Sequence, residues 1–111
     1  MDITVNVEGD INLVSLEGNF DISAAEQFDA ELITLVDGGA RKIILDFSEV
    51  KFVASTGLRM ILKAAQRMKA ENGLLRICCV NKTVMEVFQM TGFDTILAIF
   101  DTVDTARDGL A

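Results

Sequence analysis

The sequence lacks several residue types on which enzymes commonly depend. Its 111 residues include no histidine, no tryptophan and no tyrosine. Without histidine the chain cannot form a Ser-His-Asp triad or a histidine metal site, and it has no imidazole general base. Any enzyme built on this sequence would need carboxylate or lysine chemistry.

Cysteine is almost absent as well, because the chain has only Cys78 and Cys79. These neighbours lie inside the apolar run 74–80, which reads as a strand. Adjacent side chains of a strand point to opposite faces, so we expect that the two thiols do not pair with each other. Two buried thiols without ligand spacing favour core residues over a redox pair and indicate a reducing compartment, the cytoplasm.

Positive charge is scarce, and the formal net charge is −7. An acidic protein is not attracted without specificity to nucleic acid or to an anionic membrane surface. The first residues contain no basic segment, and no apolar run approaches the length of a membrane span. We therefore expect protein partners, with no direct nucleic-acid binding and no membrane.

Half of the residues are hydrophobic, which is ample for the core of one domain over residues 1–111. Alternating apolar residues around Gly9-Asp10 predict a β-hairpin over 3–16. Ser23, with Glu26 three residues later, predicts the start of a helix over 24–36 that stops at Gly38. The continuous apolar run 42–46 is typical of a central strand.

The second half of the chain predicts three further helices that alternate with strands. A helix over 56–72 stops at Gly73 and is followed by the strand 74–80. The next helix begins at Asn81 and ends at Gly92, the last strand spans 96–100, and Asp101 starts a terminal helix. The order β-β-α-β-α-β-α-β-α predicts an α/β fold: a mixed sheet with an N-terminal hairpin, about four covering helices and parallel pairs joined by crossovers.

The candidate chemical site is the hydroxyl pair Ser55-Thr56, which lies where a buried strand gives way to an amphipathic helix. A serine at a helix start can cap backbone N–H groups, and the same unpaired amides would stabilise a phosphate attached there. Spacing alone favours the cap. Gly57 is explained equally well by close packing and by the approach of a partner to the hydroxyl.

The helix after this pair carries four basic side chains against one acidic side chain over residues 55–72. A solvated face explains such a run more often than a docking surface, and we retain both interpretations. Met60, expected on the exposed side, is either a partner contact or an isolated apolar surface residue. Three acidic residues could gather near Ser55 and bind a divalent cation, namely Asp21, Asp46 and Glu49. Such residues are usually solvated, and we expect no metal and no cofactor.

Four motifs together resemble those of STAS domains, specifically the bacterial anti-sigma factor antagonists. The similarity runs from about Val5 to about Thr105 and rests on the segments Gly18-Asn19-Phe20-Asp21, Leu45-Asp46-Phe47-Ser48, Phe52-Val53-Ala54-Ser55-Thr56-Gly57-Leu58 and Phe88-Gln89-Met90-Thr91-Gly92-Phe93. The chain departs from the common pattern at three positions: Asn19 replaces a frequent Glu, Ala54 a frequent acidic residue, and Arg59 a frequent Gly.

The resemblance implies a partner-switching regulator of sigma-factor-dependent transcription that is not itself an enzyme. In that role the unphosphorylated protein binds an ATP-dependent anti-sigma factor serine kinase, phosphorylation releases it, and a serine phosphatase reverses the change. The implied phosphoacceptor is Ser55, with Thr56 as the fallback. The implied partner-binding residues are Asp21, Ala54, Ser55, Thr56, Gly57, Arg59, Met60 and Lys63.

Two other functions remain open at this point. The chain could be a STAS interaction or ligand-binding module in a signalling scaffold, with Ser55 acting only as a cap. A small enzyme or a receiver-like phosphoacceptor is the third possibility. A receiver needs an acidic pair after its first strand, an acceptor aspartate and a late lysine, and the segments 8–10 and 96–100 do not supply them.

Overall fold

The computed structural model of the protein describes residues 1–110 and is built on a five-stranded mixed sheet with the order β1-β2-β3-β4-β5. The first two strands form an antiparallel hairpin, and the remaining pairs are parallel. The predicted mixed sheet, its hairpin and its central third strand are confirmed. The strands are β1 (Asp2–Glu8), β2 (Ile11–Phe20), β3 (Lys42–Val53), β4 (Leu74–Cys78) and β5 (Ala98–Phe100).

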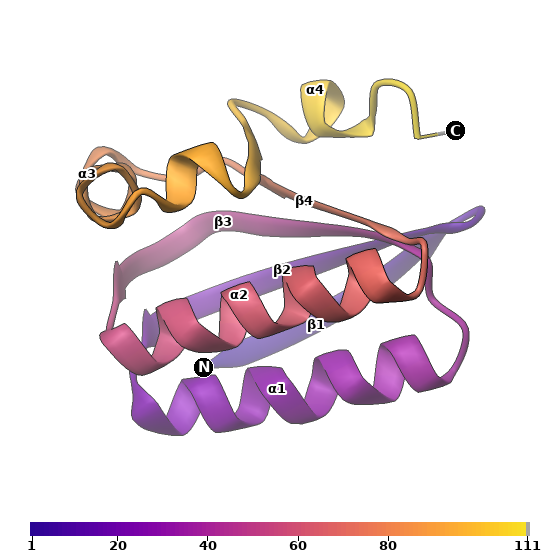
Figure 1. Ribbon diagram of the computed structural model, residues 1–111, viewed down its shortest axis with the longest axis horizontal. Coiled ribbons are helices and arrows are strands. Elements are labelled where there is room, and N and C mark those ends of the chain that lie inside the picture. Colours follow the sequence, from indigo (N-terminus) through magenta and orange to yellow (C-terminus); the bar gives the residue numbers. More distant parts are fainter. Residues whose placement is uncertain (111) are drawn as a thin grey trace.

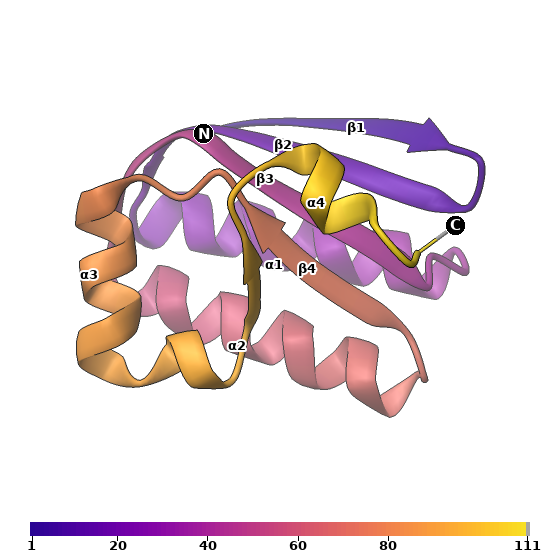
Figure 2. The same cartoon turned by 90° about the horizontal axis from the view of Figure 1, so that it is seen from above.

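The helices cover the two faces of this sheet unequally. Helices α1 (Ile22–Asp37) and α2 (Ser55–Ala70) lie side by side on one face, and the short α4 (Val103–Arg107) covers the other face (Figures 1 and 2). Helix α3 (Lys82–Thr91) lies beside the carboxyl end of β4 and leads into a 3-10 turn, Phe93–Thr95. No helix within residues 1–110 has the length and apolar character needed to span a bilayer.

The main core lies between the sheet and the helices α1, α2 and α3. Four fully buried phenylalanines form a chain of ring contacts through it, with centroid separations of 5.1, 6.3 and 6.3 Å, in the order Phe28, Phe20, Phe47 and Phe88. Aromatic rings at these separations add to the stabilisation that comes from their buried area. Phe20 and Phe47 therefore join the two strands that precede α1 and α2 into one packed layer.

A second, smaller core lies under α4 and includes Ile44, Cys78, Ala106 and Leu110. Two cations attach the C-terminal segment to the sheet through its backbone carbonyl oxygens. Nη1 of Arg76 donates to the oxygens of Ala106 and Asp108 at 3.0 and 2.6 Å, and Nζ of Lys42 donates to the oxygen of Leu110. The Arg76 guanidinium also stacks on the Phe100 ring at 5.0 Å.

Three predicted helix starts are wrong by one or two residues. The carboxylate of Asp21, not the hydroxyl of Ser23, caps α1 by accepting the N–H of Ala24 at 2.9 Å. Helix α2 has Ala54 rather than Ser55 at its N-cap position. Thr102 replaces Asp101 as the cap of α4 in a reciprocal arrangement with Thr105. In each case the backbone enters the helix one or two residues away from the predicted position, so a different side chain meets the free amides.

The other predicted ends agree more closely with the structure. Asn81 caps α3 through Val84 N–H at 2.8 Å, and the left-handed Gly92 ends that helix, as predicted. Gly38 is the C-cap of α1, also as predicted. Helix α2 ends earlier than expected, because Asn72 already takes the left-handed conformation one residue before Gly73. The last strand is shorter than predicted and starts at Ala98.

Candidate functional site

The ends of two parallel strands bring the candidate site together. Phe20, the last residue of β2, pairs in register with Val53, the last residue of β3. The backbone N–H of Ala54 donates to the Phe20 carbonyl oxygen at 2.9 Å. Asp21 follows β2 directly and Ser55 follows β3 after one residue, so both lie at the same edge of the sheet, where α1 and α2 begin (Figure 1).

The start of α2 leaves backbone donors free. Leu58 N–H donates to the Ala54 carbonyl at 3.0 Å, which is the first intrahelical bond. Ala54 has no side-chain oxygen, and no side chain caps this helix. The amides of residues 55–57 therefore lack a partner among residues 1–110. Free amides together with the positive end of the helix dipole form a favourable environment for an anion.

The two hydroxyls of the site occupy different environments. Ser55 is the first residue of α2 and is exposed, and its hydroxyl makes no hydrogen bond within residues 1–110. Oγ1 of Thr56 is buried and also lacks a partner in the described chain. A group-transfer reaction needs a hydroxyl that the donor can reach. The structure therefore distinguishes Ser55, which solvent reaches, from its neighbour.

Gly57 is buried against Phe20. An ideally placed Cβ at this position would lie 2.5 Å from Cδ1 of Phe20 and 3.0 Å from its carbonyl oxygen. Real Cβ atoms do not approach other atoms this closely, so close packing explains this glycine. The missing side chain lets α2 begin directly against the end of β2.

The basic face predicted for α2 is smaller than its sequence indicates. Nζ of Lys63 pairs with Asp29 of α1 at 2.9 Å. Arg67 pairs with Asp37 of α1 at 2.7 Å and also with Glu71 at 3.4 Å. Arg59 is exposed and has no ion pair in the described part of the chain. Because Arg59 lies one helical turn after Ser55, its spacing suits it to meet a group attached to Ser55.

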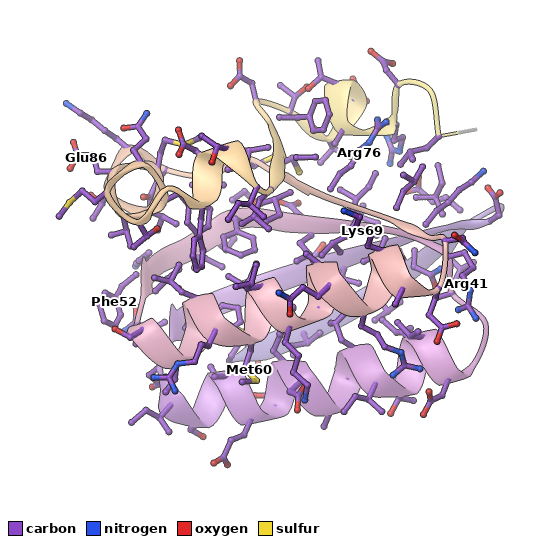
Figure 3. The ribbon with its side chains drawn as sticks, viewed as in Figure 1. Arg41, Phe52, Met60, Lys69, Arg76 and Glu86 are labelled. Carbon is purple, nitrogen blue, oxygen red and sulfur yellow. The ribbon has the colours of Figure 1, made fainter. Side chains whose placement is uncertain are left out.

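The sequence predicted Met60 on the exposed side of α2, and this prediction is wrong. Its side chain is half-buried, packs against the main core and points toward α1 (Figure 3). It lines a groove between the two helices together with Ile22, Ala25, Glu26, Asp29 and Thr56. Of the predicted partner-binding residues, Asp21, Ser55 and Arg59 are exposed around the helix start, whereas Thr56 and Met60 line the groove.

Two exposed apolar residues near the hydroxyl pair were not among the partner-binding residues predicted from the sequence. Phe52 is 51% exposed and projects outward beside the start of α2 (Figure 3), and Ile22 at the start of α1 is 64% exposed. The sequence carried a signal for the first of them. Phe52 directly precedes Val53, the buried last residue of its strand, so an alternating pattern places an aromatic ring on the open face.

The three acidic residues considered as possible cation ligands do not form a shared site in the part of the chain that the structure describes. Asp21 caps α1, and Oδ1 of Asp46 accepts the N–H of Ser48 at 2.9 Å. Within residues 1–110, the one group of three metal-binding side chains whose ligand atoms all lie within 4.8 Å contains Asp46, Cys78 and Cys79. The two thiols are free, as expected, but their side chains do not point to opposite faces as strand alternation had predicted: their Sγ atoms are 3.1 Å apart. Cys79 leaves the strand in a left-handed conformation, which turns its side chain toward Cys78.

Comparison with known proteins places this geometry in a family. The sequence model of the STAS domain matches residues 2–106. BtrV of Bordetella bronchiseptica, whose name assigns it to the anti-sigma factor antagonists, is 31% identical over 106 residues, which cover 96% of this chain and 91% of BtrV. The anti-sigma-B factor antagonist of Bacillus subtilis is 28% identical over 102 residues, covering 89% and 92% of the two chains.

Solved structures agree with the sequence comparison. The anti-sigma factor antagonist SpoIIAA in its unphosphorylated form superposes with a TM-score of 0.74 at 24% identity, covering 94% of this chain and 92% of SpoIIAA. The phosphorylated form of SpoIIAA, a cell fate determinant of Bacillus, gives a TM-score of 0.77 at 25% identity, covering 99% and 100%. The expected fold is confirmed. The names of these relatives describe regulatory proteins and not enzymes, as expected for this chain.

Proposed function

The chain belongs to the STAS domain family, and on that premise we propose that it is an anti-sigma factor antagonist that switches partners through phosphorylation of Ser55. With Ser55 unmodified, the protein binds an ATP-dependent anti-sigma factor serine kinase and so frees a sigma factor. Phosphorylation ends that binding, and a serine phosphatase restores it. Two free thiols and the role itself favour the cytoplasm as the site of action.

The observation that carries this proposal is the exposed Ser55 hydroxyl at a helix start without a cap. In the reaction, Oγ of Ser55 forms a bond to the γ-phosphorus of ATP while the bond from that phosphorus to the β-phosphate oxygen breaks. ADP leaves, and the hydroxyl proton passes to a base of the kinase. ATP, magnesium and the base all belong to the kinase, so this chain is a substrate and a ligand.

A phosphate on Ser55 changes charge without requiring a change of fold. It adds a charge of about −1.5 to −2 at neutral pH. The free amides of residues 55–57 and the unpaired Arg59 would stabilise that charge in the isolated protein. A partner surface placed over Ser55 and the exposed Phe52 would instead have to bury it. A mismatch of about 1.4 kcal/mol already lowers affinity tenfold.

The phosphoacceptor is tested by incubating the protein with ATP in a lysate of its native cells and locating the phosphate by peptide mass spectrometry. We expect phosphate on Ser55 in the wild-type protein and in Thr56→Val, and none in Ser55→Ala. Ser23→Ala is the matched control, because Ser23 is an exposed serine in the first turn of the neighbouring helix. Phosphate that persists in Ser55→Ala would contradict the assignment.

The binding half of the proposal is tested separately, with the anti-sigma factor kinase purified from the same cells. Unmodified protein and Ser55→Ala should both bind this kinase, whereas phosphorylated protein should bind at least about tenfold more weakly. If Ser55 is never modified and the partner stays bound under all conditions, the constitutive interaction module is the correct function.

A further inference from the structure

The sheet face under α4 carries a cluster of side chains that the switching function does not use. Cys78 is the last residue of β4 and lies in register with Asp46 on the neighbouring strand β3. Cys79 follows with φ of 66°, a left-handed conformation that is uncommon for cysteine. Its N–H donates to the Phe100 carbonyl at 3.2 Å, which holds the turn in place.

This turn brings three potential ligand atoms together. The two Sγ atoms are 3.1 Å apart, and a carboxylate oxygen of Asp46 lies within 4.8 Å of both. Oδ1 of Asp46 accepts the N–H of Ser48 at 2.9 Å, so the carboxylate is oriented by the backbone and keeps its second oxygen available. Within residues 1–110 no other group of three such side chains is this compact.

The chemistry of the ligands selects the kind of ion. Thiolates bind zinc and softer cations, whereas magnesium and calcium prefer sites made of oxygen atoms alone. Two sulfurs bound to one zinc at about 2.3 Å lie roughly 3.7 Å apart, so a small rotation of the half-buried Cys79 side chain suffices. We propose that Asp46, Cys78 and Cys79 bind one thiophilic divalent cation of the zinc and cadmium class.

The surroundings are compatible with a bound cation. Cys78 is fully buried, while Cys79 and Asp46 are half-buried, so an ion reaches the sulfurs from the Cys79 side. Burial raises the pKa of both thiols, so binding displaces a proton from each of them. Two thiolates and one carboxylate exceed the charge of the ion by one. The Arg107 guanidinium, which also pairs with Glu8 and Asp104, adds positive potential at the Cys78 sulfur and reduces the effect of that excess.

The site is separate from Ser55. It lies on the face covered by α4, whereas α2, which begins at Ser55, lies on the opposite face (Figure 2). An ion would connect β3 to β4 and to the segment that leads to α3. Binding to the folded chain alone would raise its stability by mass action. The test therefore requires neither the kinase nor any phosphorylated form, and its failure would leave the proposed function intact.

Cadmium is the probe for the experiment, because thiolate ligands give its complexes a charge-transfer absorption in the ultraviolet. Titration of the reduced full-length protein should produce this band with a break at one cadmium per chain. A large excess of zinc should reduce the band by competing for the same ligands, and zinc alone should raise the thermal midpoint.

Two variants and one control decide the outcome. Cys79→Ser should remove the band, since it deletes one sulfur from a half-buried position. Asp46→Asn keeps an oxygen for the Ser48 amide but removes the negative charge, and it should weaken cadmium binding at least about tenfold. Asp101→Asn, an exposed acidic residue outside the cluster, should bind like the wild type. No band at one equivalent, or a band unchanged in Cys79→Ser or in Asp46→Asn, would overturn the site.

Discussion

Gly57 and Phe20 pack so closely that no methyl group fits between them. A Cβ at position 57 would lie 2.5 Å from the Phe20 ring and 3.0 Å from its carbonyl oxygen. Ring movement can relieve the first contact. The second involves backbone of β2 that is already held by the Ala54 N–H. This contact fixes the start of α2, and with it Ser55, against the end of the sheet.

We predict that Gly57→Ala destabilises the protein by about 1–3 kcal/mol, as overpacking of a core does. The clash outweighs the gain of up to about 1 kcal/mol that alanine brings to a helix interior. Urea unfolding measures the loss. The double variant with Phe20→Leu should be less destabilised than the sum of the single variants, because the ring contact is shared. An additive result would contradict the packing explanation.

The cap of α1 gives a second prediction. Asp21→Ala should cost about 1 kcal/mol, because it leaves the Ala24 amide without the carboxylate oxygen at 2.9 Å. Ser23→Ala should change stability by less than about 0.5 kcal/mol, since its hydroxyl caps nothing. Thermal unfolding of the two variants side by side makes the comparison. A larger loss of stability in Ser23→Ala than in Asp21→Ala would instead support Ser23 as the helix cap, as the sequence had predicted.

The buried hydroxyl of Thr56 gives a third prediction. An unpartnered buried oxygen costs about 1–3 kcal/mol, so Thr56→Val, which keeps the shape, should leave stability unchanged or raise it. Thr34→Val is the matched control, because the Thr34 hydroxyl donates to the Ala30 carbonyl at 3.0 Å. Removal of this hydroxyl should lower the stability slightly. Chemical denaturation measures both variants. A clear loss of stability in Thr56→Val would show that its hydroxyl has a partner.

The thiol of Cys78 links stability to alkaline pH. Burial raises the pKa of this thiol in the folded protein. In an unfolded chain the pKa of a cysteine thiol is about 8.5. The contribution of the Cys78 thiol is therefore fully present below about pH 8.5 and declines as the pH rises, because only the unfolded state releases the proton. We expect the urea midpoint to fall from neutral pH to about pH 10 more steeply in the wild type than in Cys78→Ala. Parallel slopes would contradict this.

Phosphorylation of Ser55 should leave the fold intact. The phosphorylated protein should unfold cooperatively, and Arg59→Gln should remove about 0.3–1 kcal/mol of the stabilisation that the phosphate receives. Lys69→Gln is the control, because Lys69 is exposed in the last turn of the same helix and is remote from Ser55. Unfolding of the phosphorylated and the unphosphorylated form of the wild type and of each variant completes a double-mutant cycle. Loss of cooperative unfolding on phosphorylation would refute the prediction.

Sequence patterns predicted the elements well because those signals are local. Asn81 and Gly92 bound α3 as expected, and the continuous apolar run in β3 correctly indicated a central strand. Caps were harder to predict, since a serine, aspartate or alanine near the boundary can occupy the same position. Which of them does so depends on where the preceding strand ends, and in β3 the strand runs on to Val53.

The errors in the candidate sites have tertiary causes. The ion pair between Lys63 and Asp29 follows from the packing of α1 against α2, which the periodicity of a single helix does not reveal. The approach of the two cysteines depends on the backbone at Cys79, whose N–H is held by β5. Alternation along a strand predicts side-chain direction only as long as the strand continues, and β4 ends at Cys78.

The bonds that attach the C-terminal segment have a consequence for sequence variation. Arg76 and Lys42 reach this segment through carbonyl oxygens, which every amino acid supplies. The side chain at position 108 can therefore diverge freely among descendants of this sequence without loosening the attachment. Position 76 cannot, because a lysine there would lose the planar group that stacks on Phe100 while donating to two oxygens. Drift at this attachment should therefore be one-sided, with the exposed position 108 varying and the donor at position 76 retained.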